Sequence, residues 1–350
     1  MNCLRLVVQP ARTLAAAPGI ALNFGIPLMA PNASVGSGDR KCEVLSGRTH
    51  PRRSVLEPPA PLLAWRQTKL RLIAVFFRAF LISIAALTTA CTDLPVRSEQ
   101  IASDAGLLKQ HLRGDPYEHI AFVGPEMRPD KPLHVYLSGD GTPWIGRTRI
   151  AYDPTPRNPI ALRLMALDRS PRIFLGRPCY QGLSGSPGCN PFLWTGGRYS
   201  EAVVVSMTAA LRRFIDENGY RDVVLIGYSG GGVLAWLIAE RLEQVRLLVT
   251  IAANLDIDAW TTLHGYTPLM GSLNPASRGA ALPERVAQLH LVGIRDTNVP
   301  PSLVRSAMGR AGRLDEVRTV PSDHRCCWES HWPDILDAIE DVRARRSTIE

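Results

Sequence analysis

A serine flanked by glycines at the end of an apolar run most constrains how this chain can fold. Residues Val223–Tyr228 are aliphatic or aromatic apart from Gly227, Ser229 follows, Gly231 comes two positions later, and a helical pattern begins at once. A strand that turns sharply into a helix strains the backbone of the turn residue, so the residues two positions away must lack side chains. The Ser229 hydroxyl then stands at a helix N-terminus, where unpaired N–H groups stabilise negative charge on a bound oxygen. The pattern predicts that Ser229 is a nucleophile; the alternative is a glycine-rich turn without chemistry.

Positive charge is concentrated at the N-terminal end of this chain of 350 residues. The chain has 40 Lys and Arg against 32 Asp and Glu; the first 90 residues hold 11 and 3 of these, which leaves 29 of each sign after them. Because the remainder is neutral overall, we expect no basic surface for nucleic acid on the folded part. No group of His and Cys residues has the spacing of a metal site, and we expect neither a metal nor a cofactor.

The N-terminal part does not have the pattern of a folded domain. Residues 1–65 contain scattered Pro, Arg and Ser without periodicity, which predicts disorder or a stretch that precedes the true start of translation. Residues 66–91 begin with basic residues and continue as an apolar run. The uninterrupted part of that run has the length of a signal-peptide core and is short for a membrane span.

The end of this run, Leu87-Thr88-Thr89-Ala90-Cys91, resembles the lipobox of bacterial lipoproteins, in which the cysteine becomes the lipid-modified N-terminus. The usual Leu three positions before the cysteine is replaced by Thr88. The resemblance implies export and a lipid anchor on Cys91. It also implies a cell-envelope location, with the periplasmic face of the outer membrane favoured because Asp93 does not directly follow the cysteine. An uncleaved anchor in the inner membrane is the alternative.

Four further cysteines agree with export. Cys179 and Cys189 bracket a Gly/Ser/Pro-rich loop that a disulfide could close. Cys326 and Cys327 are adjacent, and the sequence leaves open whether they are free thiols, a vicinal disulfide or partners of other cysteines.

Beyond a polar, partly helical linker at residues 92–114, strands and helices alternate over residues 115–350. Strands are predicted at His119–Val123, Leu133–Leu137, Ile173–Leu175, Val223–Tyr228, Leu247–Ala252, Leu289–Gly293 and Val317–Val320. Helices are predicted at Pro159–Leu167, Glu201–Asn218, Gly231–Glu243, Ser302–Gly312 and Trp332–Arg345. This alternation predicts an α/β domain with a mostly parallel sheet covered by helices on both faces. The irregular stretch 254–281 is predicted to form a lid or wall over a site.

The sequence Gly227-Tyr228-Ser229-Gly230-Gly231 between a predicted strand and helix resembles the α/β-hydrolase fold. The resemblance covers roughly residues 115–345. It implies a three-layer α/β architecture and a catalytic triad in the order Ser, acid, His along the chain.

A nucleophilic serine needs a base, and the base needs an orienting acid. His324 follows the last predicted strand, where the resemblance places the base; His331 is the alternative, and His290 lies within a strand pattern typical of a packed side chain. Asp296 follows the preceding strand in the spacing G-x-x-D-x-x-V-P, where the resemblance places the acid. Asp256 is the alternative acid, and Asp296 could instead cap the next helix.

Two backbone N–H donors are needed to stabilise the oxyanion. The resemblance assigns one to Gly230 and the other to the loop Ser138-Gly139-Asp140-Gly141, from either Asp140 or Gly141. The alternative for this loop is an ordinary Gly-Asp-Gly turn.

These residues together predict a serine hydrolase that cleaves a small-molecule or lipid-like carboxylic ester through an acyl-enzyme. Ester cleavage is implied by the fold resemblance alone. The alternatives are another acyl-transfer enzyme, such as a peptidase or thioesterase, and a non-catalytic, membrane-tethered binding protein. The sequence indicates no oligomeric state.

Overall fold

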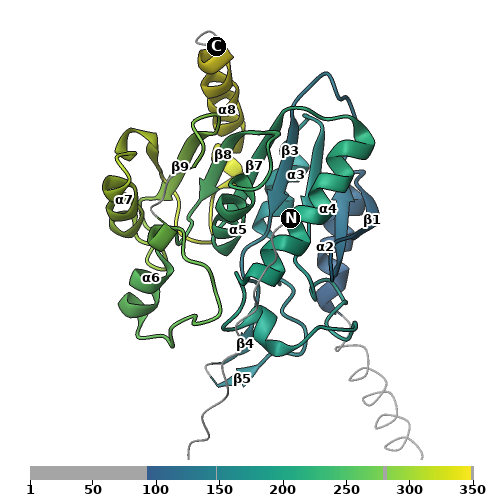
Figure 1. Cartoon of the computed structure of the whole chain (residues 1–350), viewed down its shortest axis with the longest axis vertical. Coiled ribbons are helices and arrows are strands. Elements are labelled where there is room, and N and C mark those ends of the chain that lie inside the picture. Colours follow the sequence, from purple (N-terminus) through teal and green to yellow (C-terminus); the bar gives the residue numbers. More distant parts are fainter. Residues whose placement is uncertain (1–92, 147, 279–281, 348–350) are drawn as a thin grey trace, which may run out of the picture. The chain divides into compact units, whose positions relative to one another are not determined.

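The computed structural model of the chain describes residues 93–146, 148–278 and 282–347 (Figure 1). The predictions for residues 1–65 and 66–91, with the lipid anchor on Cys91, lie outside these residues. Within the described part of the chain, no helix is both long and apolar enough to cross a membrane.

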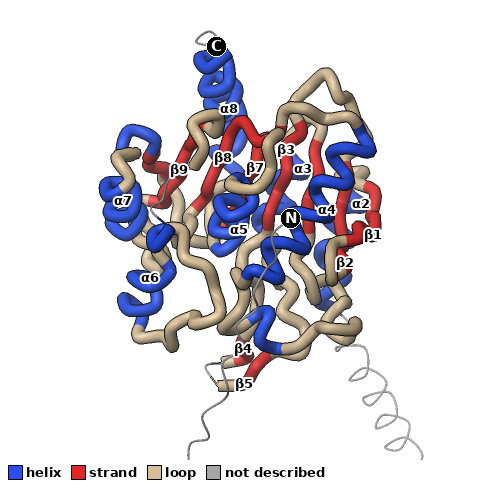
Figure 2. Tube along the Cα trace, in the orientation of Figure 1, coloured by secondary structure: helices blue, strands red, loops and turns tan. Residues whose placement is uncertain are grey.

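The centre of the domain is an eight-stranded sheet (Figure 2). Its strands, in spatial order, are β1 (Leu108–Arg113), β2 (Glu118–Val123), β6 (Arg172–Leu175), β3 (Leu133–Leu137), β7 (Val223–Tyr228), β8 (Val245–Ile251), β9 (Ala287–Gly293) and β10 (Val317–Val320). β2 pairs antiparallel with both of its neighbours, and every other pair is parallel. A separate small hairpin joins β4 (Trp144–Ile145) and β5 (Arg149–Ile150).

Helices cover both faces of this sheet. They are α2 (Asp93–Asp104), α3 (Ile160–Leu167), α4 (Glu201–Asn218), α5 (Gly230–Ala239), α6 (Ile257–His264), α7 (Pro301–Arg310) and α8 (Trp332–Ser347). Side chains of α4, α5 and α7 pack into one core cluster, and side chains of α2, α3 and α8 pack into the other. Successive strand residues alternate between the two clusters, as Leu225 and Ile226 do, because neighbouring side chains of a strand point to opposite faces. The predicted three-layer α/β architecture is therefore confirmed.

The seven predicted strands and five predicted helices are present, with small shifts at their ends. Both ends of α4 agree with the prediction. Its C-terminal end is set by Gly219, whose left-handed conformation (φ 74°) stops the helix. α5 ends at Ala239, four residues earlier than predicted.

The stretch predicted as a linker is part of the domain over its described residues 93–114. It contains α2, as its partly helical character predicted, but also the unpredicted edge strand β1, which pairs with β2 from Leu108↔Val123 to Arg113↔Glu118. β1 is exposed along nearly its whole length and has a polar sequence, so it lacks the apolar alternation that marks a half-buried strand.

Both cysteine pairs form disulfides. Cys179 and Cys189 are bonded, which closes the loop between them as predicted. Cys326 and Cys327 are bonded to each other, so the vicinal disulfide is the one of the three alternatives that the structure contains.

The carboxyl ends of the parallel strands place the predicted site residues at one edge of the sheet. The loop beginning at Ser138 follows β3, Ser229 follows β7, Asp296 lies three residues after β9, and His324 lies four residues after β10. In open α/β sheets this edge is where ligands bind.

His290 is a packed side chain of β9, as predicted. Its Nδ1 lies 2.9 Å from Thr250 Oγ1 and its Nε2 lies 3.2 Å from Gln288 Oε1. Burial, with a smaller contribution from the charge of Arg313, lowers the pKa of His290 from 6.5 to about 3.

We predict that His290 makes the domain sensitive to acid. Between pH 6.5 and about 3 the unfolded chain takes up a proton at this residue that the folded chain does not, so stability is lost as the pH falls through this window. In urea unfolding between pH 7.5 and 4.5, the free energy of unfolding should fall less steeply with decreasing pH for His290→Gln than for the unchanged protein. The exposed His111 of β1, changed to Gln, is the matched control. Equal slopes for the unchanged protein and His290→Gln would contradict the prediction.

Candidate active site

Ser229 occupies a strained turn between β7 and α5. Its backbone has φ 51° and ψ −126°. Residues other than glycine rarely adopt such positive φ values. A Cβ atom on Gly227 would collide with the backbone carbonyl group of Gly231, and one on Gly231 would collide with the carbonyl oxygen of Leu137. Both glycines are therefore required by close backbone packing around Ser229.

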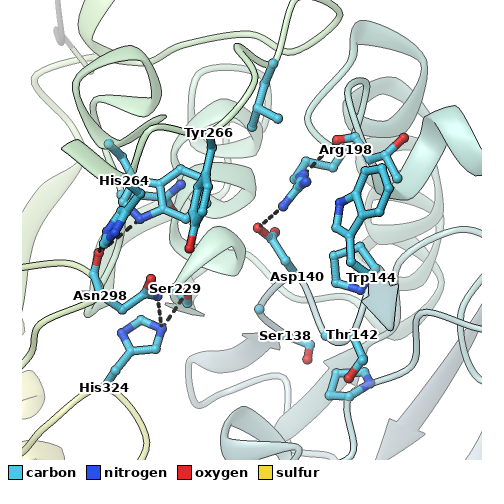
Figure 3. A pocket seen from close by; sticks show the side chains of 18 of the residues that line it. Ser138, Asp140, Thr142, Trp144, Arg198, Ser229, His264, Tyr266, Asn298 and His324 are labelled. Carbon is cyan, nitrogen blue, oxygen red and sulfur yellow. Dashed lines mark hydrogen bonds and ion pairs between the residues drawn. The ribbon is translucent and has the colours of Figure 1, made fainter. Parts of the chain in front are cut away.

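The predicted nucleophile, base and acid lie in one hydrogen-bonded series. Ser229 Oγ is 3.2 Å from His324 Nε2 (Figure 3). On the other side of the ring, His324 Nδ1 is 2.8 Å from Asp296 Oδ2. Asp296 is only 3% exposed, and its second oxygen accepts hydrogen bonds from the N–H groups of Asn298 and Val299, both at 2.8 Å. The imidazole is thus held on one side by a buried, fixed carboxylate and faces the serine on the other.

The alternative residues have other positions. Asp256 caps α6 by accepting a hydrogen bond from the Ala259 N–H group at 3.1 Å, and it also pairs with Arg310 at 2.5 Å. His331 is the last residue of a short 3₁₀ helix and does not line the cavity that contains Ser229 and His324. The capping role considered for Asp296 is not observed, because Pro300 is the N-cap of α7.

The loop after β3 lies directly against Ser229. A Cβ atom on Gly139 would be 3.3 Å from the Ser229 Cβ, and one on Gly230 would collide with the Asp140 carboxylate. Gly141 has φ 70°, a conformation that favours glycine. Among the described residues, neither the Asp140 nor the Gly230 N–H group donates a hydrogen bond to another part of the chain. Both donors are thus available beside the serine.

A charged cluster fixes this loop. The Asp140 carboxylate accepts hydrogen bonds from Arg177 Nη2 at 2.9 Å, from Arg198 Nη1 at 2.8 Å and from the Tyr199 hydroxyl at 2.8 Å. The Tyr180 hydroxyl donates to the Asp140 carbonyl at 3.0 Å. Burial on its own disfavours the ionised carboxyl, but Arg198 and Arg177 outweigh this effect and hold the Asp140 pKa below its usual value. The loop is therefore held by a half-buried carboxylate that stays ionised.

Ser229 and His324 open onto a cavity of about 1260 Å³. Residues between Asn254 and Leu269, in the stretch predicted as a lid or wall, form one wall. There the rings of His264 and Tyr266 stack at 5.1 Å, and Trp260 packs edge-on against both. Trp144 and Arg198 lie across the cavity from this aromatic wall (Figure 3). The cavity is large enough for a substrate of small-molecule size.

Asn298 is a site residue that the sequence analysis did not identify. Its Nδ2 lies 2.9 Å from His324 Nε2, the same nitrogen that faces Ser229. Its backbone carbonyl accepts hydrogen bonds from Trp260 Nε1 at 3.0 Å and His264 Nε2 at 2.7 Å. Asn298 therefore connects the aromatic wall to the base, and its position two residues after the acid was the available signal.

The cluster around Asp140 was also not predicted. Its members come from three separate segments, and in the sequence Arg177 and Tyr180 resemble ordinary loop residues. Among the described residues, no group of three or more His, Cys, Asp or Glu side chains is arranged to hold a metal ion.

Comparison with known proteins supports the fold. No family model and no curated protein matches the chain. The esterase Pf2001 of Pyrococcus furiosus, in two crystal forms, superposes with TM-scores of 0.51 and 0.50 at 11% identity, covering 69% of this chain and 93% and 92% of that protein. XC6422 of Xanthomonas campestris, an α/β serine hydrolase without a lid, has a TM-score of 0.43 at 13% identity over 68% of this chain and 94% of its own. With the sheet order described above, the similarity to Pf2001 shows that the chain has the α/β-hydrolase fold.

We predict that Asp140→Asn lowers the free energy of unfolding by about 3–5 kcal/mol, because it leaves two buried guanidinium groups without a compensating charge. Urea denaturation checks this value. Asp130→Asn is the matched control, because Asp130 forms an exposed ion pair with Arg128 and its loss should cost far less. Similar losses in the two variants would show that the cluster does not stabilise the domain.

Proposed function

We propose that this protein is a serine hydrolase that cleaves a carboxylic ester through an acyl-enzyme on Ser229. The observation that supports it is the series Ser229 Oγ, His324 and Asp296, with distances of 3.2 and 2.8 Å, at a strained turn that opens onto a cavity. A serine hydroxyl is a weak nucleophile unless a neighbouring base removes its proton. A binding protein on this scaffold would need neither the strained serine nor the aligned base and acid.

The chemistry follows from this geometry. Ser229 Oγ attacks the acyl carbon while its proton passes to His324 Nε2, and Asp296 stabilises the imidazolium through Nδ1. The N–H group of Gly230 and one from the loop at Asp140 and Gly141 stabilise the negative oxygen of the tetrahedral intermediate. Collapse of the intermediate expels the alcohol, which takes the proton from His324. A water molecule then repeats the sequence on the acyl-enzyme and frees Ser229.

The choice of an ester as substrate is proposed from the common chemistry of this fold and from the similarity to an esterase structure, and not from the geometry of the three residues. A peptidase or thioesterase would use the same three residues. Rates on matched esters, amides and thioesters with one acyl group distinguish these activities. We expect the ester to be cleaved fastest, and a faster amide or thioester would favour the corresponding alternative.

We predict that a fluorophosphonate probe labels the protein and that Ser229→Ala abolishes the labelling. Asp296→Asn should lower kcat about 10⁴-fold, because the imidazole loses the group that holds its tautomer and stabilises its charge. Asp256→Asn is the matched control, because this carboxylate caps α6 and should leave most of the activity. Absence of labelling in the unchanged protein, or a larger loss in Asp256→Asn than in Asp296→Asn, would overturn the assignment.

Asn298 supplies a second donor to the base. In the neutral imidazole with its proton on Nδ1, Nε2 has a single lone pair, and both the Ser229 hydroxyl and the Asn298 amide lie within reach of it. The amide lies closer, at 2.9 Å against 3.2 Å. Donation by the amide holds the imidazole ring in place, so Asn298 acts as a positioning residue that must turn away when the serine proton arrives.

We predict that Asn298→Ala lowers kcat about threefold to tenfold with little change in KM, because the imidazole loses one of the hydrogen bonds that orient it. The exposed neighbour Thr297, changed to Ala, is the control. Steady-state kinetics on one ester checks this. An unchanged kcat in Asn298→Ala, or an equal loss in Thr297→Ala, would exclude this role.

A further inference from the structure

The cavity above Ser229 is lined by an excess of positive charge. Arg157, Arg198 and Arg325 line it, whereas Asp140 is the only Asp or Glu among the described lining residues. Residues 91–350 hold equal numbers of basic and acidic residues, so this excess is local to the cavity. A cavity whose lining has an excess of one sign of charge favours ligands of the opposite sign.

The single carboxylate does not neutralise this charge. Asp140 faces two guanidinium groups, those of Arg177 and Arg198, and both of its oxygens already accept hydrogen bonds from the cluster. Burial raises the pKa of Tyr180 and of Tyr199, so both hydroxyls in the cluster remain neutral. The cluster therefore has a net positive charge beside the nucleophile.

Of the two guanidinium groups in the cluster, Arg198 lines the cavity and Arg177 does not. Its side chain is only 8% exposed, its Nε donates to the Thr195 carbonyl at 2.7 Å, and its Nη1 donates to Asp140 at 2.8 Å. Its third nitrogen, Nη2, donates to no group of the described chain and is not among the fully enclosed polar atoms. In Figure 3 the side chain lies on the wall opposite Tyr266 and His264, on the same cavity as Ser229. Two of its three nitrogens are fixed by the protein, and the third remains for a ligand.

We propose that this cavity selects esters that contain an anionic oxygen group, such as a carboxylate, and that Arg198 is the residue that binds this group. A guanidinium group pairs with carboxylate oxygens through charge-assisted hydrogen bonds, and one held in place loses little conformational freedom on binding. Arg157 and Arg325 are exposed at the cavity and add attraction for the anion without being fixed by the protein. This inference rests on the proposed ester hydrolysis and narrows its substrate class.

Two matched ester pairs test the preference. In the first pair the acyl group differs: the 4-nitrophenyl monoester of adipic acid is compared with its methyl ester, which has no free carboxylate. In the second pair the leaving group differs: 3-carboxyphenyl butyrate is compared with 3-carbamoylphenyl butyrate. We expect kcat/KM to favour the anionic member about tenfold to a hundredfold in at least one pair, which corresponds to one charge-assisted hydrogen bond.

Substitutions assign the preference to Arg198. Arg198→Gln should reduce the anionic-to-neutral ratio about tenfold or more, mainly through KM, and Arg198→Lys should restore part of it. Because Arg198→Gln also alters the Asp140 cluster, the pair Arg157→Gln and Arg325→Gln provides a second test at exposed positions, with a smaller fall in the ratio. Arg128→Gln, at an exposed arginine outside the cavity, is the matched control.

The outcomes separate this inference from the proposed function. A ratio near one in both pairs, in a protein that hydrolyses the neutral esters and reacts with the fluorophosphonate probe, would overturn the anionic preference alone. An unchanged ratio in a folded Arg198→Gln variant would overturn the role of Arg198. No hydrolysis of any ester and no labelling would instead overturn the proposed function.

Discussion

The close approach of the first turn of α5 to the end of β3 is the contact on which the site depends. Gly231 packs against the Leu137 carbonyl, and this approach is possible only without a side chain. The same contact brings the loop that continues from β3 against Ser229, so that Gly230 and Asp140 become neighbours. One backbone contact between the first turn of α5 and the end of β3 therefore sets the positions of the proposed nucleophile and of the donors expected to stabilise its oxyanion.

Buried charge then makes this arrangement rigid. A carboxylate taken out of water is destabilising unless it is paired and hydrogen-bonded, and Asp140 has both kinds of partner in Arg177, Arg198 and Tyr199. Because the cluster that holds the loop has two guanidinium groups and one carboxylate, it also leaves positive charge at the cavity. The same charges thus hold the loop and account for the proposed preference for anionic substrates.

The imidazole of His324, the proposed base, is also held by a network of hydrogen bonds. Asp296 is fixed by the N–H groups of Asn298 and Val299, and Asn298 is fixed in turn by Trp260 and His264 of the aromatic wall. The wall of the cavity and the proposed base are therefore connected through one residue. A ligand that moves the wall would act on the base through Asn298.

The alternation of strands and helices and the turn at Ser229 follow from local sequence patterns, because buried parallel strands are continuous apolar runs and the sharp turn permits only glycine at two positions. The positions expected for the base and the acid came from the resemblance to the α/β-hydrolase fold. Local patterns failed at β1, whose exposed, polar edge has no periodic signal, and they could not choose among the three states of Cys326 and Cys327. Tertiary packing brings Asn298 and Ser229 to the same imidazole nitrogen of His324 and joins Arg177 and Arg198 at Asp140. Those contacts join segments tens of residues apart, and their partners are set by the packing of the sheet edge and not by any local pattern.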